Sequence, residues 1–508
     1  MSVKDLIFKQ AKEVDERYQA AKGLRPRMNK VFPEHFSFLF GELALYSFVV
    51  LLLTGTYLAL FFQPSSAELV YHGSYTPMHD VEMSQAFAST LDISFDVRAG
   101  LLVRQMHHWA ANIFVAAILV HLLRIFFTGA FRKPREANWI IGVFLLILGI
   151  AEGFAGYSLP DDLLSGTGLR IMSGIVLSIP LLGTWLHWLV FGSEFPGELI
   201  IPRLFAGHIL ILPGLILVLI AVHLAGVWYQ KHTQFPGERG TERNVVGVRT
   251  FPAFAARSTS LAIMVTGILA LMGGIFQINP IFTYGPYQPS MSSINSQPDW
   301  YLQMIEGAMR LWPGWRIDLG NYTVPAVFWP AVVMPILLFG SILVYPFVER
   351  RLTRDTGLAH NIAQRPRDVP VRSGFGAMTL AFYFVLVIAG NDDVIDFVFS
   401  VPFERVVWFG RIGVLVLPPL AFYLTYRICL ALQRADRDVI RHGVGTGVIQ
   451  RHAEGYFVEV TQPLRAEPDQ ESLKFARYRG NPVPHLPGDL ETTKDGGKVA
   501  AKDTGRLP

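Results

Sequence analysis

Residues 101–127 read LLVRQMHHWAANIFVAAILVHLLRIFF, an apolar run that is long enough to cross a lipid bilayer as one helix. Three histidines interrupt this run, namely His107, His108 and His121. Ionisable side chains inside a membrane span are costly, so each of them is a hypothesis for a functional site. The run therefore predicts a membrane protein that uses imidazole groups inside the bilayer.

The composition of the whole chain agrees with this prediction. Its 508 residues are 51% hydrophobic and only 17% charged, which is too little charge to cover the surface of a soluble protein. The single cysteine excludes a disulfide framework, a cysteine-based zinc site and a self-contained iron–sulfur centre. A net charge of +4 does not favour nucleic-acid binding.

Eight stretches have the roughly 20 apolar residues that a membrane helix requires. They are continuously apolar rather than alternating, which does not favour a β-barrel. The sequence therefore predicts an all-α integral membrane protein with eight transmembrane helices. The stretches cover residues 38–62, 101–127, 139–158, 204–229, 259–278, 324–347, 375–390 and 406–431.

Lysine and arginine are concentrated in alternate loops between these spans. Three loops carry 14 such residues, and the other four carry 5. Cytoplasmic loops are the ones enriched in Lys and Arg, and an even number of spans puts both ends of the chain on one face. Both termini are therefore predicted to be cytoplasmic. Residues 163–190, on the opposite face, are apolar but broken by Pro and Gly, and they predict short helices lying across that outer face.

The spans divide the chain into four parts. Residues 1–36 are basic and lack an apolar core, so they are not a signal peptide; they form either an interfacial helix or a disordered basic arm. Residues 37–230 are predicted to form a four-helix bundle, and residues 231–431 a second membrane domain of four helices. Residues 432–508 are predicted to form a cytoplasmic tail that is largely disordered beyond about residue 463.

The fourth span, 204–229, contributes two more intramembrane histidines, His208 and His223. His107 and His121 are 14 residues apart and His208 and His223 are 15 apart, so each pair lies on nearly one face of its helix. Since a single span separates the two helices, both run in the same direction. His107 is then expected to face His208 near the outer side, and His121 to face His223 near the inner side, roughly 21 Å away.

Two facing imidazoles at each of two depths predict two bis-histidine haems stacked across a bilayer, since histidine is an axial ligand of haem iron. Zinc would need a third and a fourth ligand at each level, which the pattern does not offer. A lone intramembrane histidine is more often a hydrogen-bonded structural residue, but two matched pairs favour haem. His108 lies about 100° around the helix from His107, so it is expected to face elsewhere.

Glycine pairs with the same spacing accompany the histidines. Gly41 and Gly55 in the first span are 14 residues apart, and so are Gly142 and Gly156 in the third. A flat macrocycle between helices needs a neighbouring backbone without side chains, although small residues also serve ordinary helix packing.

Two arginines, Arg104 and Arg124, each lie three residues from a histidine of the second span. They suit the propionates of haem, because arginine pairs well with carboxylates. The alternative is that they are interfacial arginines whose side chains extend to the membrane surface.

These elements resemble the cytochrome b subunit of the quinol–cytochrome c reductase (cytochrome bc) complex. The resemblance covers roughly residues 37–430, and the long tail on a fused eight-helix chain is similar to the Gram-positive bacterial branch. The Pro-Asp-Trp-Tyr sequence resembles the family's Pro-Glu-Trp-Tyr motif at the outer quinol-oxidation site. Besides the histidine and glycine pairs, the resemblance rests on Gly156-Tyr157-Ser158-Leu159-Pro160 and Pro298-Asp299-Trp300-Tyr301.

The resemblance implies a multi-pass subunit in the cell membrane that oxidises quinol in a respiratory electron-transfer chain coupled to proton translocation. One electron passes to a Rieske iron–sulfur subunit, and the other passes through two b-type haems to quinone at an inner site. Further implied partners are a dihaem cytochrome c subunit, a terminal cytochrome c oxidase in a supercomplex, and a second copy of the complex. Menaquinone is the quinone expected for this branch.

At the outer site, the resemblance implies catalytic roles for Asp299 and Tyr301. Asp299 would accept a proton, because a carboxylate buried beside apolar walls has a raised proton affinity, and Tyr301 would orient the quinol ring. Asp299 replaces the family's glutamate and is one methylene shorter, which puts direct contact with quinol in doubt. The other residues implied at this site are Pro298, Trp300, Gly168 and Tyr157.

The inner quinone site is poorly marked. Where mitochondrial-type members have Lys-Asp at the start of the fifth helix, this chain has Arg257 and Ser258. His232 or Lys231, which follow the fourth span, could substitute at this site.

Two other functions would also use intramembrane histidines. A third alternative, a purely structural membrane anchor, would not explain four spaced histidines. A dihaem anchor of another quinone-linked dehydrogenase is the main alternative, and the motif at 298–301 argues against it. A secondary transporter would use histidines as a proton relay, but it predicts broken helices and repeat symmetry, which the sequence lacks.

Overall fold

The computed structural model describes residues 3–236, 240–293 and 297–462, together with four short strands in the tail. Disorder is predicted from the sequence beyond about residue 463. Apart from these four strands, the residues of that segment lie outside the described ranges. The four strands are β9 (Arg465–Ala466), β10 (Leu473–Lys474), β11 (Leu490–Thr492) and β12 (Lys498–Ala500).

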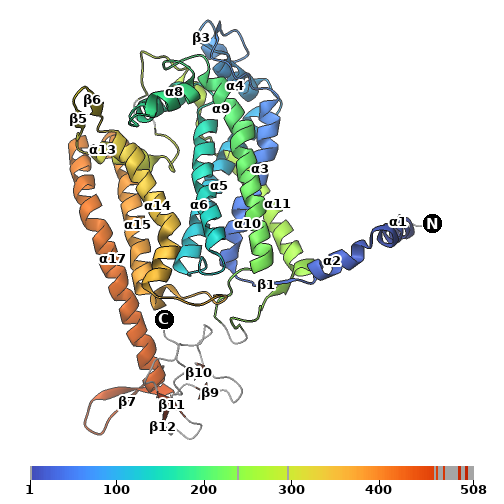
Figure 1. Cartoon of the computed structure of the whole chain (residues 1–508), viewed down its shortest axis with the longest axis vertical. Helices are drawn as coiled ribbons and strands as arrows, with labels where there is room; N and C mark the ends of the chain where they lie inside the picture. Colours follow the sequence, from blue (N-terminus) through green and yellow to red (C-terminus); the bar gives the residue numbers. More distant parts are fainter. Residues whose placement is uncertain are drawn as a thin grey trace.

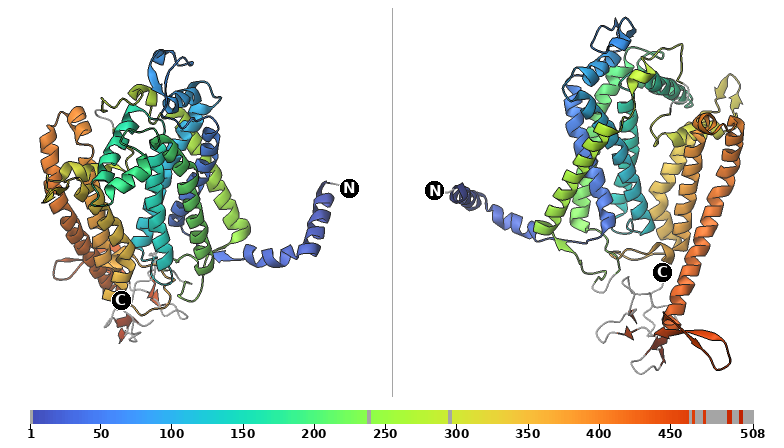
Figure 2. Two further views of the ribbon diagram at one scale, coloured as in Figure 1. Left: turned by 45° about the horizontal axis from the view of Figure 1, so that its top comes forward. Right: turned by 180° about the vertical axis from the view of Figure 1, so that it is seen from behind.

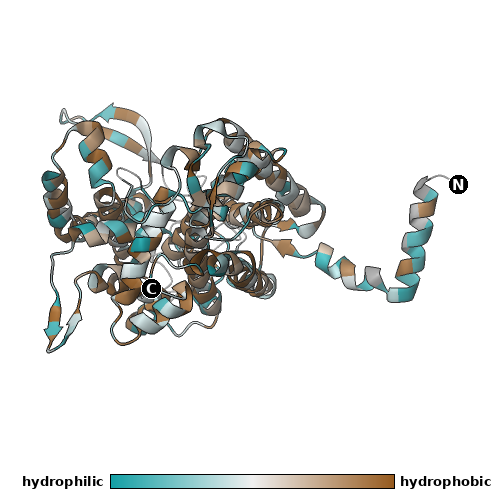
Figure 3. Cartoon of the chain, turned by 90° about the horizontal axis from the view of Figure 1, so that it is seen from above, coloured by the Kyte–Doolittle hydropathy of each residue, from teal (hydrophilic) through white to brown (hydrophobic). Residues whose placement is uncertain are grey.

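Eight helices within the described ranges are long and apolar enough to cross a membrane, which confirms the predicted number of spans. Their long axes run side by side in Figure 1, and hydrophobic residues cover most of the bundle in Figure 3. The spans are built on α3 (Leu39–Ala59), α5 (Gly100–Phe127), α6 (Glu136–Tyr157), α9 (Ile200–Ala206) with α10 (Leu212–Gln230), α11 (Ala255–Ile275), α14 (Met334–Leu352), α15 (Pro370–Ala389) and α17 (Phe403–His442).

A wide π-helical turn, η3 (Gly207–Ile211), joins α9 to α10 within one span. The N–H of Leu212 donates to the carbonyl of Gly207 there, five residues away instead of the usual four. Such a turn holds one residue more than a turn of α-helix. A similar turn, η5 (Trp329–Val333), precedes α14. The segment before α11, η4 (Thr250–Phe254), is instead kinked at Phe251, whose backbone is extended.

The seventh span begins at Pro370, earlier than the predicted limit of 375. Proline is well suited to the first turn of a helix. Arg372, in this first turn, is almost completely buried and pairs with Glu349 of α14. The sequence suggested a charged loop here, but the pairing lets the helix continue through its arginine.

The last helix, α17, continues to His442, well beyond the predicted limit of 431. Its polar extension is held by Asp436, which lies within 3.4 Å of Arg365 and within 3.3 Å of Arg367 in the loop before α15. A hairpin of β7 (Val444–Arg451) and β8 (Phe457–Gln462) follows the helix.

The N-terminal arm consists of two helices, α1 (Val3–Tyr18) and α2 (Ala20–Met28). Its position at a membrane interface stays a prediction. The arm projects from the bundle in Figures 1 and 2. At its base, β1 (Val31–Phe32) pairs antiparallel with β4 (Val248–Arg249).

Short elements cover the end of the bundle opposite the tail hairpin, which we call the outer end (Figure 1). The predicted short helices over 163–190 are found there. Asp162 caps the first of them, because its carboxylate accepts hydrogen bonds from Leu164 N–H and Ser165 Oγ. The elements of this end are β2 (Glu68–Val70), η2 (Thr76–Met78), β3 (Glu82–Ser84), α4 (Gln85–Phe95), α7 (Leu163–Leu177), α8 (Gly183–Phe191), α12 (Ile281–Tyr284), α13 (Gln303–Leu311), β5 (Ile317–Leu319), β6 (Tyr322–Val324) and α16 (Asp392–Phe399).

Helix α13 packs tightly on α15. A Cβ atom added to Gly307 of α13 would lie 1.8 Å from the carbonyl oxygen of Leu386 on α15. Only glycine permits this approach of the two backbones. The contact fixes α13 and therefore the segment just before it, which carries the motif 298–301.

We predict that Gly307→Ala lowers the free energy of unfolding of the purified protein by about 1–3 kcal/mol, and therefore its melting temperature. The reason is that the new methyl group would clash with the backbone of Leu386, which cannot move aside. Gly267→Ala is the matched control, since a Cβ added to this glycine of α11 meets no atom within 4 Å. Equal melting temperatures for the two variants would contradict the tight contact.

Candidate functional site

Four histidines on α5 and α10 with its preceding π turn meet as two pairs inside the bundle. The ring centroids of His107 and His208 are 6.1 Å apart, and those of His121 and His223 are 6.4 Å apart. One metal ion bonded to a nitrogen of each ring at about 2 Å, with half a ring added on each side, requires a similar separation. The geometry of both pairs therefore suits a six-coordinate metal with two axial imidazoles.

Hydrogen bonds orient both rings of the outer pair. His107 Nδ1 lies 2.9 Å from Thr54 Oγ1, which donates its own hydrogen to the carbonyl of Val50 and can only accept from the histidine. His208 Nδ1 lies 3.2 Å from the carbonyl oxygen and 3.1 Å from Oε1 of Glu152, and both of these are acceptors. Each Nδ1 therefore carries the proton, and each Nε2 is left for a metal.

The inner pair lacks comparable partners. The Nδ1 atoms of His121 and His223 are buried and have no hydrogen-bond partner within the ranges that the structure describes. The two pairs thus differ in their surroundings, although their spacing is nearly the same.

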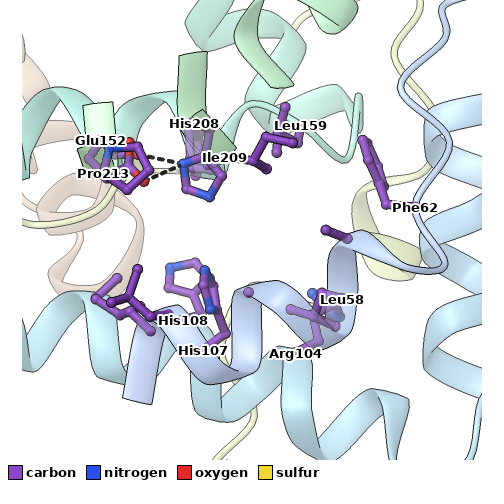
Figure 4. A pocket seen from close by; sticks show the side chains of 18 of the residues that line it. Leu58, Phe62, Arg104, His107, His108, Glu152, Leu159, His208, Ile209 and Pro213 are labelled. Atoms are coloured by element: carbon purple, nitrogen blue, oxygen red, sulfur yellow. Dashed lines mark hydrogen bonds and ion pairs between the residues drawn. The ribbon is translucent and has the colours of Figure 1, made fainter. Parts of the chain in front are cut away.

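A cavity of about 470 Å³ surrounds the outer pair. Figure 4 shows His107 and His208 facing each other across it, with Arg104 and Glu152 in its wall. The volume is within the range of cofactor pockets, and the wall is mostly apolar, as such pockets are.

Three of the four predicted glycines lie directly against the histidine rings. A Cβ atom added to Gly41 would lie 3.0 Å from His121 Cε1, and one added to Gly55 would lie 3.1 Å from His107 Cε1. At Gly156 the distance to His208 Cε1 would be only 2.4 Å. Gly142 differs, because its nearest side-chain atom is Leu122 Cδ1 at 4.0 Å.

Both predicted arginines have buried donors without acceptors. Arg104 donates from Nη1 to the carbonyl of Asn279, but its Nε and Nη2 have no partner among the described residues. The Nε and Nη2 atoms of Arg124 are likewise unpartnered, and its guanidinium lies 4.5 Å from the centre of the Phe38 ring. Buried unpaired donors are rare in proteins, and here they suit the carboxylates of a bound group. Together with the imidazole pairs, they fit haem at both levels.

The motif residues Asp299 and Tyr301 meet His108 in the wall of the outer cavity. His108 Nε2 lies 3.0 Å from both carboxylate oxygens of Asp299, and the Tyr301 hydroxyl donates to Oδ2 at 2.8 Å. The His108 and Asp299 side chains are 15% and 13% exposed. His108 thus turns away from the His107–His208 pair and toward a carboxylate that the sequence analysis did not connect to it.

The expected rise in the proton affinity of Asp299 is wrong. Burial alone would raise the pKa of this carboxyl, but the neighbouring His108 and the hydrogen bonds from His108 and Tyr301 outweigh burial and lower the pKa below its ordinary value. Asp299 is therefore ionised and able to accept a proton over the physiological pH range.

The remaining residues predicted at the outer site surround this cluster. Tyr157 lines the cavity and is buried, and a Cβ atom on Gly168 would lie 3.5 Å from its ring. Trp300 and Tyr301 line a second, apolar cavity of about 110 Å³, whose wall also includes residues of α5, α6, α14 and α15. Pro298 is half-buried and does not line either of these two cavities.

The inner-site candidates make two sets of contacts. The ring of His232 stacks on Phe38, with centroids 5.1 Å apart. Arg257 pairs with Glu34.

Ser258 donates to Glu42 Oε2 at 2.5 Å and also contacts the Tyr46 hydroxyl. Glu42 and Tyr46 lie on α3 and were missed by the sequence analysis. A carboxylate near the start of an otherwise apolar span was the available signal.

Comparisons with known proteins identify chains that are similar to this one. The profile of the family described as Cytochrome b(N-terminal)/b6/petB matches residues 112–286, which include three of the four paired histidines. The cytochrome bc1 complex cytochrome b subunits of Corynebacterium diphtheriae and Mycobacterium bovis are each 54% identical to this chain, over 94% and 95% of it and 88% of their own lengths. The corresponding subunit of Streptomyces coelicolor is 47% identical over 96% of this chain and 88% of its own length.

Among solved structures, a hyperthermophilic respiratory Complex III matches with a TM-score of 0.63. The match has 22% sequence identity and covers 83% of this chain and 98% of the other. At this identity it supports the fold alone.

We predict that His107→Ala or His208→Ala removes the outer haem, whereas His121→Ala or His223→Ala removes the inner one, because each pair supplies both axial ligands. Reduced-minus-oxidised spectra of purified protein would then lose one of two b-type signals. His187→Gln is the control, since His187 is also buried at the outer end but bonds to Ser173. Full haem content in any of the four alanine variants would exclude that histidine as a ligand.

Proposed function

The chain belongs to the cytochrome b subunits of cytochrome bc1 complexes, and we propose that it oxidises quinol at its outer end and returns one electron to quinone at its inner end. As a member of this family, it is a multi-pass protein of the bacterial cell membrane with a role in respiratory electron transfer. The family also implies haem cofactors and, within the assembled complex, quinol–cytochrome c oxidoreductase activity.

Two b-type haems are proposed, each with two histidine ligands. His107 and His208 would hold the outer one, and His121 and His223 the inner one. Arg104 and Arg124 would bind propionates. Haem, when bound, supplies one-electron carriers between the two quinone sites. The glycines proposed to border it are Gly41, Gly55, Gly142 and Gly156.

Quinol oxidation releases two protons and two electrons, and the observation that carries this function is the Asp299 carboxylate in the cavity wall, hydrogen-bonded to His108 and Tyr301. Its carboxylate is the proposed acceptor for a quinol proton. The Nε2–H of His108 and the hydroxyl of Tyr301 hold it by hydrogen bonds. The shorter side chain of aspartate, compared with the family's glutamate, is thus fixed rather than extended. Tyr157, Gly168, Pro298 and Trp300 complete the proposed outer site.

The proposed partners come from membership of the cytochrome bc1 family. We propose that the second electron passes to a Rieske iron–sulfur subunit and then to a dihaem cytochrome c subunit. A terminal oxidase in a supercomplex and a homodimer of the complex are further proposals, as is menaquinone as the substrate.

The inner quinone site and the orientation are also proposals. His232, Arg257 and Ser258 remain the proposed inner residues, now with Glu42, which accepts a hydrogen bond from Ser258 and offers a carboxyl group for proton delivery. Both termini are proposed to be cytoplasmic, on the strength of the Lys and Arg distribution. The parts 37–230 and 231–431 are proposed as separate membrane domains.

We expect Asp299→Asn to slow quinol oxidation by about 100-fold or more, the usual contribution of a positioned base, while both haems stay bound. The measurement is the steady-state rate of cytochrome c reduction by the complex, with the haem spectrum as the control. Wild-type turnover at every pH would remove Asp299 from the mechanism. Normal haem content with no quinol oxidation even in the wild-type complex would favour the dihaem anchor of another dehydrogenase.

The pH dependence of turnover offers a separate test. His108 is a cause of the lowered pKa of Asp299, so in His108→Ala burial should raise this pKa. Asp299 must be ionised to accept a proton, and the acid limb of the rate profile should therefore move to higher pH. Turnover at mildly acidic pH should fall while turnover at alkaline pH is kept. A profile with the acid limb of the wild type would exclude this role of His108.

A further inference from the structure

Glu152 is a carboxylate inside a membrane span that the proposed function does not use. It lies on α6, and its side chain is 16% exposed in the wall of the outer cavity. Its Oε1 is 3.1 Å from Nδ1 of His208, and its carbonyl oxygen is 3.2 Å from the same nitrogen. Dashed lines in Figure 4 mark these contacts.

The carboxylate is not required to satisfy His208. The carbonyl oxygen of Glu152 already accepts from Nδ1–H, and every residue at this position would offer that oxygen. A carboxylate within the membrane is costly to bury, and Glu152 Oε2 is itself buried with no partner among the described residues. The charge therefore calls for a functional explanation.

Because of this contact, the surroundings of Nδ1 differ among the four paired histidines. Nδ1 of His107 faces the neutral hydroxyl of Thr54, not a carboxylate. The Nδ1 atoms of His121 and His223 have no hydrogen-bond partner within the described ranges. A carboxylate next to an imidazole is thus a feature of the outer level.

We propose that Glu152 is a positioning residue that lowers the reduction potential of the haem held by His107 and His208, an inference that rests on the proposed function. A carboxylate that accepts the Nδ1–H bond fixes the ring orientation and makes the opposite nitrogen a more basic ligand. Both the stronger ligand and the nearby negative charge stabilise the oxidised iron.

A lower potential at the outer haem would favour electron transfer in one direction. If the outer level holds an electron less tightly than the inner level, transfer from the outer quinol site toward the inner quinone site is favourable. Glu152 acts on one level only, so it creates a difference between two sites whose histidine spacings are otherwise similar.

Glu152→Gln tests the inference, because glutamine keeps the side-chain length and the backbone carbonyl but removes the charge. In a redox titration of the purified complex, the outer haem should move to higher potential and the inner haem should stay unchanged. At the wild-type midpoint, the ratio of reduced to oxidised outer haem should rise about tenfold, or 59 mV for one electron. A unit charge acting across one ring in a low-dielectric interior has an effect of this order.

Two further variants complete the design. Glu152→Asp keeps the charge but withdraws it by one methylene, so its shift should have the same direction and be smaller. Glu136→Gln, on the same helix, is the matched control, since Glu136 lies at the inner end and pairs with Arg350. It should leave the outer potential unchanged. The spectrum of His208→Ala identifies the outer signal.

Each other outcome has a definite meaning. Two bound haems with an unchanged outer potential in Glu152→Gln would overturn the inference and leave the proposed function intact. Loss of the outer haem in both Glu152 variants would also overturn it, because Glu152 would then be needed to build the site. A wild-type complex without b-type absorbance would instead remove the proposed function.

Discussion

The structure depends on imidazole rings that face each other across about 6 Å at two depths between α5 and α10 with its π turn. Rings so placed leave no room for a side chain beside them. Gly55 and Gly156 therefore border the outer pair, and Gly41 borders one ring of the inner pair. Nε and Nη2 of Arg104 and Arg124, which have no partner within the described ranges, belong to the same constraint, because the carboxylates of a bound group would accept their hydrogen bonds. The histidines, glycines and arginines proposed to hold haem thus meet one common geometric requirement.

Much of this design could be predicted from the sequence, because apolar length and helical period are local properties. The eight spans and the common face of His107 and His121 need only the rise and twist of a helix. The exact ends of the spans could not be predicted from the sequence, because they depend on tertiary contacts such as the pairing of Arg372 with Glu349. Gly142 kept the period of its partner glycine but does not touch a histidine ring.

The contacts that the sequence did not reveal join distant parts of the chain. His108 and Asp299 are 191 residues apart, and no periodicity relates them. Burial is expected to raise the pKa of the Asp299 carboxyl. The contact with His108 instead contributes to a lowered pKa. Glu152 and His208 likewise lie on different helical segments. Only the packing of these segments brings the carboxylate next to a histidine of the outer pair.

The wide turn η3 has a consequence for helix register. His208 lies within this turn, and 15 residues separate it from His223, one more than separate the histidines of α5. Because the turn absorbs the surplus residue, the two helices stay in phase despite their unequal count. Shortening the chain by one residue within η3 would restore an ordinary helix with matched spacing. The same deletion between Leu212 and Val222 would instead rotate one ring by about 100° relative to the other. The π turn thus keeps the side chains of His208 and His223 on the same face of the span.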